Sequence, residues 1–307
     1  MTTPAITPAP PRAARIYLLL ALMLLIWSAN YIFAKLATRE LPLVLVLGLR
    51  YALAGALMWP VYLVARRHPD PAVVPWTLRD LPVLLGCGFF GLVGNQLLFV
   101  AGISFTSVTH AAIITALAPV MVLLGAAAVG QERITPAKLR GILIAMSGII
   151  VLQCGKDPTG GATLFGDAIM VVSTLVFSAF SVFGKGPAGR FGSLTLNAFA
   201  YLSTGLLALP VLYWATRHYQ PWSASPVAWS GIVYMALFTS IVGYLIYAYA
   251  LRHFPASRVA GVTYLQPILA SLLAMVVLHE RPTLSLAAAT ALVLIGLHQT
   301  RPQNPSV

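Results

Sequence analysis

The amino-acid sequence predicts an all-α integral membrane protein with ten transmembrane helices in two inverted five-helix repeats. Three observations support this prediction: the composition, an internal duplication, and an odd number of spans in each copy. The chain of 307 residues is 59% hydrophobic and only 8% charged, with a mean hydropathy of +0.87. Soluble domains carry about 25% charged residues, so we interpret the chain as membrane-embedded, without room for a separate soluble domain.

The clearest sign of duplication is a stretch of 38 residues, 96–133, that returns in altered form as 244–281. The two copies align without a gap at an offset of 148, and ten of the 38 positions are identical. The identical positions include a threonine, a proline four residues later, and a closing Glu-Arg pair. Weaker echoes outside this stretch, at offsets of 150 or 148, extend the duplication to most of the chain.

Apolar runs near the 20 residues that a bilayer requires place the ten spans. We expect them at 16–35, 42–65, 80–102, 107–130, 137–154, 165–185, 193–214, 228–251, 255–279 and 283–300. The first repeat then covers residues 15–154 and the second covers residues 165–300. Because five spans are an odd number, the second repeat must cross the membrane in the opposite direction. Residues 1–14 are expected to form a disordered, Pro-rich tail and residues 301–307 a second tail.

Basic residues predict the orientation, because Lys and Arg gather on the cytoplasmic side of membrane proteins. The side that holds both termini carries 13 of them in its loops and at the two termini, and the other side carries five. We therefore expect both tails in the cytoplasm. The net charge of +12 is interpreted as topology and not as nucleic-acid binding, because the basic residues are scattered singly between apolar runs.

Each copy of the duplicated stretch places a proline near the middle of a span. A proline lacks an N–H, so it frees the carbonyl of the residue four positions earlier. That residue is Thr115 for Pro119 and Thr263 for Pro267. Paired interruptions in two halves are a strong sequence pointer to a transporter's binding site. Two interpretations stay open: the threonines bind substrate, or each hydroxyl satisfies its own helix while the proline makes a kink that can also act as a hinge.

Polar and aromatic residues at helical spacing are expected to line the same cavity. Trp27, Asn30 and Tyr31 share one face of the first span. The other candidates are Gln96 and Phe99 in the third span, Tyr244 and Tyr247 at the equivalent positions of the eighth, and Tyr264 and Gln266 before the second proline. Singly, each is explained as well by contacts between helices. As a set they favour a substrate cavity.

Charged residues inside the expected spans are few. All seven acids lie at or near span ends, which leaves no midplane carboxylate to carry protons or to pair with a cationic drug. Arg50 lies roughly 12 Å along the second span, where it either holds a substrate carboxylate or snorkels and bonds carbonyls. His110, one turn into the fourth span, either carries or senses protons or is a hydrogen-bonded structural residue. No metal or cofactor is expected, and the two cysteines are interpreted as packing residues.

The sequence also resembles a known family. The residues that carry the resemblance are the first-span motif Trp-Ser-Ala-Asn-Tyr at 27–31, the turns at 101–107 and 250–257, and a proline followed 13 residues later by a glutamate in each repeat. They are similar to the EamA branch of the drug/metabolite transporter superfamily over about residues 16–300. The resemblance implies a helix bundle around a central cavity that moves small organic metabolites, often outward. It also implies a bacterial inner (plasma) membrane, and members of the family include amino-acid exporters.

The leading hypothesis is therefore an exporter or uniporter that works by alternating access. Its partners would be the lipid bilayer and a neutral or zwitterionic small molecule, such as an amino acid. Multidrug, sugar or nucleotide-type substrates remain alternatives, as does a passive channel, and assembly as a monomer or a homodimer stays open. An intramembrane enzyme acting on lipid would need a reactive cluster, for example around His68 or His253. The sequence contains no HExxH, phosphate-binding glycine loop or GxSxG motif, so we do not expect an enzyme.

Overall fold

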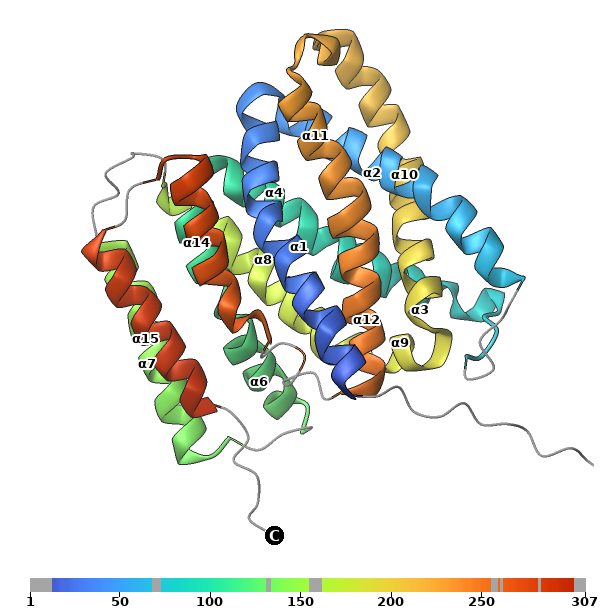
Figure 1. The fold of residues 1–307 in the computed structure, drawn as a ribbon. Helices are drawn as coiled ribbons and strands as arrows, with labels where there is room; N and C mark the ends of the chain where they lie inside the picture. The colour runs from blue at the N-terminus through green and yellow to red at the C-terminus, as the bar shows by residue number, and fades with distance from the viewer. Residues whose placement is uncertain are drawn as a thin grey trace, which may run out of the picture.

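A computed structural model of the chain describes residues 13–67, 73–130, 134–154, 162–254, 259, 262–280 and 283–300. Every regular element in this part of the chain is helical (Figure 1). The α-helices are α1 (Ala13–Glu40), α2 (Leu43–Arg66), α3 (Leu81–Gly86), α4 (Asn95–Phe105), α5 (Val108–Thr115), α6 (Ala118–Ala128), α7 (Pro136–Cys154), α8 (Leu164–Phe183), α9 (Lys185–Phe191), α10 (Ser193–His218), α11 (Pro226–Tyr234), α12 (Tyr244–His253), α14 (Gln266–Val277) and α15 (Leu284–Thr300). The π-helical segments are η2 (Cys87–Gly94) and η4 (Met235–Gly243), and the short 3-10 turns are η1 (Leu78–Asp80), η3 (Pro221–Ser223) and η5 (Val262–Leu265).

Seven stretches of the described chain are long and apolar enough to cross a membrane. They are Ala14–Glu40, Leu43–Arg66, Leu78–Phe105, Val108–Ala128, Leu164–Phe183, Ser193–His218 and Pro226–His253. These stretches correspond to the expected spans one to four and six to eight. The expected fifth, ninth and tenth spans fall on α7, α14 and α15, which are not among these seven stretches of the described chain. The structure therefore supports an all-helical membrane protein, while the count of ten spans stays a prediction.

The helices at the centre pack as two bundles of equivalent make-up. Bundle A consists of α1, the stretch α11–η4–α12, and η5 with α14; bundle B consists of α8, the stretch η2–α4, and α6 with α5, which also packs against α14 of bundle A. In the alignment of the two copies, α1 corresponds to α8, α4 to α12, and α6 to α14. Each bundle thus combines the first helix of one repeat with the third and fourth helical stretches of the other.

Two further pairs of helices, α2 with α10 and α7 with α15, pack against each other at the flanks of the bundles (Figure 1). α2 crosses α10 where Gly55 faces Gly205, and these glycines are 150 residues apart, the offset of the duplication. A Cβ at Gly55 would lie 2.8 Å from the carbonyl oxygen of Tyr201, and one at Gly205 would lie 2.9 Å from that of Tyr51. The two helices therefore approach so closely that neither position has room for a side chain.

Gly55→Ala is expected to lower the midpoint of thermal unfolding of the detergent-solubilised protein. Overpacking at a close contact costs about 1–3 kcal/mol, more than alanine gains over glycine in a helix. The matched control is Gly86→Ala, because a Cβ at Gly86 meets nothing within 4 Å. The control should unfold at the wild-type midpoint or above it. A Gly55→Ala protein as stable as Gly86→Ala would contradict the close approach of α2 and α10.

Both spans that contain the duplicated proline are interrupted at equivalent places. α5 ends at Thr115 and α6 begins at Ala118, with Pro119 in its first turn. In the second copy, the 3-10 turn η5 ends at Leu265 and α14 begins at Gln266. Proline is tolerated in the first turn of a helix, because the N–H that it lacks would have no partner there. The prolines thus mark the starts of new helices, which is a sharper interruption than the expected kink.

The helices α4 and α12 are each preceded by a π-helical segment at equivalent positions of the two copies, Cys87–Gly94 and Met235–Gly243. A π-helix bonds each N–H to the carbonyl five residues earlier, and such segments are frequent at functional sites. Polar side chains follow directly: Asn95 and Gln96 after the first segment, and Tyr244 after the second. The wider turns therefore set which way these three side chains face.

Candidate functional site

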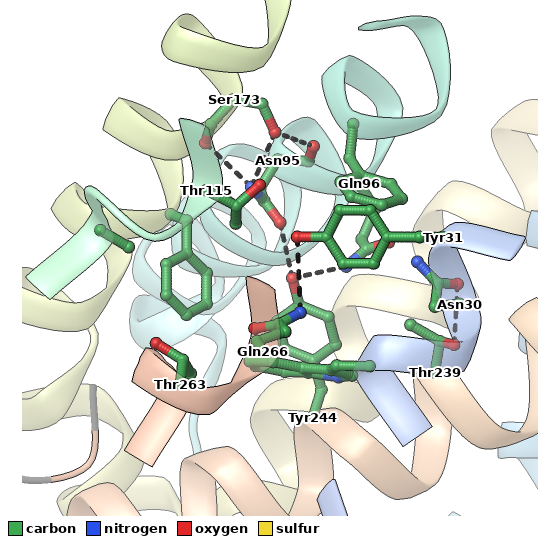
Figure 2. A pocket seen from close by; sticks show the side chains of 14 residues that line it. Asn30, Tyr31, Asn95, Gln96, Thr115, Ser173, Thr239, Tyr244, Thr263 and Gln266 are labelled. Carbon is green, nitrogen blue, oxygen red and sulfur yellow. Dashed lines mark hydrogen bonds between the residues drawn. The ribbon is translucent and has the colours of Figure 1, made fainter. Parts of the chain in front are cut away.

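A small cavity lies between bundle A and bundle B. It encloses about 40 Å³ of space open to a water-sized molecule. Bundle A contributes seven lining residues: Trp27, Asn30, Tyr31, Thr239, Tyr244, Thr263 and Gln266. Bundle B contributes the other seven: Asn95, Gln96, Phe99, Thr115, Ala118, Ser173 and Phe177 (Figure 2). A water molecule needs only about 10–15 Å³ by this measure, so the cavity holds a few waters and the bundles must separate before an organic molecule fits.

Residues that the duplication makes equivalent meet across this cavity. Gln96 Nε2 donates a hydrogen bond of 2.8 Å to the hydroxyl of Tyr244, its counterpart at an offset of 148. Thr115 and Thr263, which are identical in the two copies of the duplicated stretch, both line the cavity, one from each bundle. Trp27 packs edge-on against its counterpart Phe177, with 5.7 Å between ring centroids. The cavity therefore lies where the two repeats meet.

A chain of hydrogen bonds forms one wall of the cavity. Arg50 Nη2 donates to Gln96 Oε1 at 2.6 Å, and Gln96 Nε2 donates to the hydroxyl of Tyr244. That hydroxyl donates to Asn95 Oδ1 at 2.7 Å, and Asn95 Nδ2 donates to the hydroxyl and the carbonyl of Ser173 at 3.0 and 2.9 Å. Figure 2 shows the part of this chain from Gln96 to Ser173. Its members come from both bundles, so the wall crosses the seam between them.

The remaining polar groups of the cavity belong mainly to bundle A. Thr239 donates to Asn30 Oδ1 at 2.9 Å, and Gln266 Nε2 lies 3.4 Å from the hydroxyl of Tyr31 (Figure 2). Thr115 of bundle B donates to the carbonyl of Ala111, one turn earlier in its own helix, at 2.6 Å. The threonine thus satisfies its own helix and lines the cavity at the same time. None of the fourteen lining residues in the described part of the chain is charged.

Aromatic rings form the apolar part of the lining. Trp27 is the centre of one group, with ring centroids 5.7 Å from Phe177, 5.3 Å from Tyr244 and 5.4 Å from Tyr247. The indole N–H of Trp27 is buried and has no hydrogen-bond partner among the described residues. A second group consists of Tyr31 and Phe99, packed edge to face at 4.9 Å. The cavity therefore combines neutral hydrogen-bonding groups with ring faces.

The structure brings most of the sequence-predicted residues together. Nine line the cavity: Trp27, Asn30, Tyr31, Gln96, Phe99, Thr115, Tyr244, Thr263 and Gln266. Tyr247 is not among the lining residues; it lies behind Trp27, with its hydroxyl 2.5 Å from that of Ser181. Pro119 is buried in α6 and does not line the cavity either. The side chains of Tyr264 and Pro267 fall outside the described residues.

Five lining residues were not among the predicted site residues: Asn95, Ala118, Ser173, Phe177 and Thr239. The duplication held a signal for two of them, because Phe177 is the counterpart of Trp27 and Ala118 that of Gln266. Asn95 adjoins the predicted Gln96. Ser173 and Thr239 have apolar or glycine counterparts, so nothing in the sequence singles them out.

Polar contacts join the two bundles at one end of the cavity, which we call the Lys35 end. Lys35 of α1 donates to the carbonyl oxygens of Ile103 and Thr106, at 2.9 and 2.5 Å. Glu280, which follows α14, accepts hydrogen bonds of 3.0 and 3.2 Å from the first N–H groups of α5, and one of 2.9 Å from the hydroxyl of Thr109. A carboxylate is favourable at a helix N-terminus, where the helix dipole is positive. Lys35 and Glu280 thus clamp bundle A to bundle B.

His110 lies at the same end but belongs to bundle B alone. Its Nδ1 lies 3.0 Å from Asp167 Oδ2, and the hydroxyl of Thr106 donates to the other oxygen of Asp167 at 2.5 Å. These contacts hold the turn between α4 and α5 against α8. His110 does not line the cavity, and its contact with a carboxylate is compatible with both expected roles, the structural residue and the proton carrier or sensor.

The counterparts of the clamp at the opposite end differ. Lys185 occupies the position equivalent to Lys35, at an offset of 150, and its side chain is exposed, whereas Lys35 is partly buried. Glu132, the counterpart of Glu280, falls outside the described residues. Of the two equivalent lysines, therefore, one is held between bundles and the other is exposed. The part of the chain that the structure describes contains no group of three His, Cys, Asp or Glu side chains placed to hold a metal ion.

Comparisons with known proteins agree with this architecture. The model of the EamA-like transporter family matches residues 14–153 and again residues 164–298. An uncharacterized transporter of Archaeoglobus fulgidus is 28% identical over 282 residues, which cover 92% of this chain and 97% of the relative. A probable terminal-alkyne amino-acid exporter of Streptantibioticus cattleyicolor is 28% identical over 220 residues, with 71% and 72% covered. A solved crystal structure, 22% identical, superposes with a TM-score of 0.66 over 93% of this chain and 96% of that one, which indicates the same fold.

Proposed function

Because the chain belongs to the EamA-like transporter family and is a membrane transporter, we propose that it exports small zwitterionic metabolites of the amino-acid type by alternating access. The substrate would bind in the central cavity, between two inverted five-helix repeats. The observation that carries this proposal is the composition of the cavity wall. Seven residues come from each bundle, and each bundle combines helices of both repeats.

Alternating access requires one site that opens first to one side of the membrane and then to the other. The duplication provides equivalent residues at the two ends of the site, so two equivalent arrangements can form. If bundles A and B rock against each other, contacts at one end break while the equivalent contacts at the other end form. The clamped Lys35 and the exposed Lys185 fit one such arrangement, closed at the Lys35 end. The distribution of basic residues supports an orientation with the Lys35 end outside and both termini in the cytoplasm. The family supports a bacterial inner membrane, which the chain would cross ten times.

The cavity chemistry supports the substrate class. Amide and hydroxyl groups suit a small polar head, and the rings of Trp27, Phe99 and Phe177 suit an apolar side chain. One similar protein, from Streptantibioticus cattleyicolor, is named a probable exporter of an amino acid. Amino acids with apolar side chains are accordingly the first substrates to test.

Counterflow in proteoliposomes tests this function. Vesicles that contain the purified protein are loaded with one unlabelled amino acid at a time and diluted into radiolabelled L-leucine, with protein-free vesicles as the control. We expect saturable uptake driven by internal leucine and by similar amino acids. A protein that moved none of the twenty amino acids but accumulated cationic dyes would overturn the substrate class. Flux that never saturated would instead favour a channel.

A further inference from the structure

Arg50 is a fully buried cation without an acidic partner among the described residues. It lies in α2 with 0% of its surface exposed. Its acceptors are the hydroxyl of Ser240, bonded by Nε at 3.1 Å and by Nη2 at 3.0 Å, the amide oxygen of Gln96 at 2.6 Å, and the sulfur of Met235 at 3.7 Å. A guanidinium carries five N–H donors, and a thioether is a weak acceptor. Burying such a charge without a counter-charge is costly, and intramembrane charges are retained mainly for function.

The place of Arg50 in the fold links it to the central cavity. Its side chain reaches the seam between the bundles, because Gln96 belongs to bundle B and Ser240 belongs to bundle A. Gln96 stands between the guanidinium and the cavity that it lines. Arg50 thus does not line the cavity itself but is joined by one hydrogen bond to the lining residue Gln96.

Arg50 also fixes the direction of the hydrogen bonds in that wall. A guanidinium only donates, so the oxygen of the Gln96 amide must face Arg50 and its NH2 group must face Tyr244. The hydroxyl of Tyr244 then donates onward to Asn95. Each donor in this series points away from the positive charge. A buried charge is little screened by solvent, so this wall of the cavity has a positive potential.

We propose that the wall at Gln96, whose NH2 group has a second N–H besides the one donated to Tyr244, is the carboxylate-binding end of the central cavity, and that Arg50 supplies the charge that selects a carboxylate there. This inference rests on the proposed function, because it assigns the orientation of an amino-acid substrate within the transport site. None of the described lining residues is charged, so Arg50 is the charge nearest to the wall. An ammonium group is repelled by Arg50 and is directed away from this wall.

Three ligands separate the carboxylate from the rest of the substrate: L-leucine, L-leucinamide, which lacks the carboxylate, and 4-methylpentanoate, which lacks the amine. Their dissociation constants are measured by titration of the purified protein with a thermal-shift readout. We expect the wild-type protein to bind leucine about tenfold more tightly than leucinamide, or more, because hydrogen bonds to charged groups are the stronger ones. The preference should persist in Arg50→Lys, which keeps the charge, and vanish in Arg50→Met.

Gln96→Glu provides a second test that keeps Arg50 in place. It puts a carboxylate of nearly the same shape where the amide oxygen lies 2.6 Å from the guanidinium, which gives the buried charge a partner within the protein. The variant should fold and should lose the preference for leucine over leucinamide. The uncharged control is Gln96→Met, in which the charge of Arg50 is not neutralised. Its preference for leucine over leucinamide should fall less than that of Gln96→Glu.

The outcomes distinguish this inference from the proposed function. Equal binding of leucine and leucinamide by the wild-type protein overturns the inference, as does a preference that is unchanged in both Arg50→Met and Gln96→Glu, even if leucine counterflow is robust. Binding of leucinamide alone, or of none of the three ligands, also overturns it. Binding of 4-methylpentanoate that depends on Arg50, without any amino-acid counterflow, sustains the carboxylate-binding end and rejects the amino-acid function.

Discussion

A cross-link between residues 109 and 280 is expected to stop transport almost completely. The hydroxyl of Thr109 in bundle B lies 2.9 Å from Glu280 of bundle A, so cysteines at both positions are within reach of a short bifunctional thiol reagent. Cys87 and Cys154 are first replaced by serine. The linked protein keeps the Lys35 end closed, and we expect leucine counterflow to fall at least about tenfold, since a site that opens to one side only cannot exchange substrate. A reagent that contains a disulfide allows reduction to restore the rate.

The control links two residues of the same bundle at the same end. The hydroxyl of Ser225, which precedes α11, lies 2.7 Å from Glu40 at the end of α1. As at 109 and 280, the two cysteines replace a hydroxyl residue and a glutamate. Their cross-link should leave counterflow unchanged, because α1 and α11 move together in bundle A. Full transport by the linked 109–280 protein, with cross-linking verified by mass, would show that the bundles do not separate at this end.

Replacing both threonines of the duplicated stretch by valine is expected to weaken transport strongly while the fold is kept. Valine has nearly the shape of threonine but has no hydroxyl, so Thr115→Val and Thr263→Val remove one hydrogen-bonding group from each bundle. A net hydrogen bond contributes about 0.5–1.5 kcal/mol, and two lost bonds should raise the apparent KM for leucine about tenfold or more. Each single variant should show a smaller effect in the same direction.

Thr174→Val is the matched control for the threonine variants. Thr174 is buried in α8, does not line the cavity, and donates to the carbonyl one turn earlier at 2.8 Å, as Thr115 does at 2.6 Å. Loss of this internal bond alone should leave KM at the wild-type value. If the double variant had wild-type affinity and rate, the paired threonines would be parts of their helices only.

Much of the architecture could be predicted because the two copies of the duplication can be aligned by sequence. The alignment of the two copies locates both helix interruptions, and helical spacing places Trp27, Asn30 and Tyr31 on one inward face. The offset also pairs Gln96 with Tyr244, and these two residues meet across the cavity. Nine of the predicted residues accordingly line the cavity.

The rest depends on packing that periodicity does not encode. The spacing of α2 shows on which face Arg50 lies but not that Ser240 and Gln96 oppose it, so its role had two open interpretations. The wider turns of the π-helical segments shift which side chains face the centre, and a helical pattern of normal period does not reveal them. The Lys35 and Glu280 contacts join residues far apart in sequence, and only the assembled bundles bring them together.

Trp27 offers the most direct measurement of the central claim that substrate binds in the cavity between the bundles. A protein in which the other five tryptophans (Trp59, Trp76, Trp214, Trp222 and Trp229) are replaced by phenylalanine, and which still catalyses leucine counterflow, reports on Trp27 alone. Titration with leucine should change its fluorescence, with half-saturation at the KM for transport, because its ring lines the cavity. Active counterflow with Trp27 emission that stays constant at saturating leucine would contradict a substrate site in this cavity.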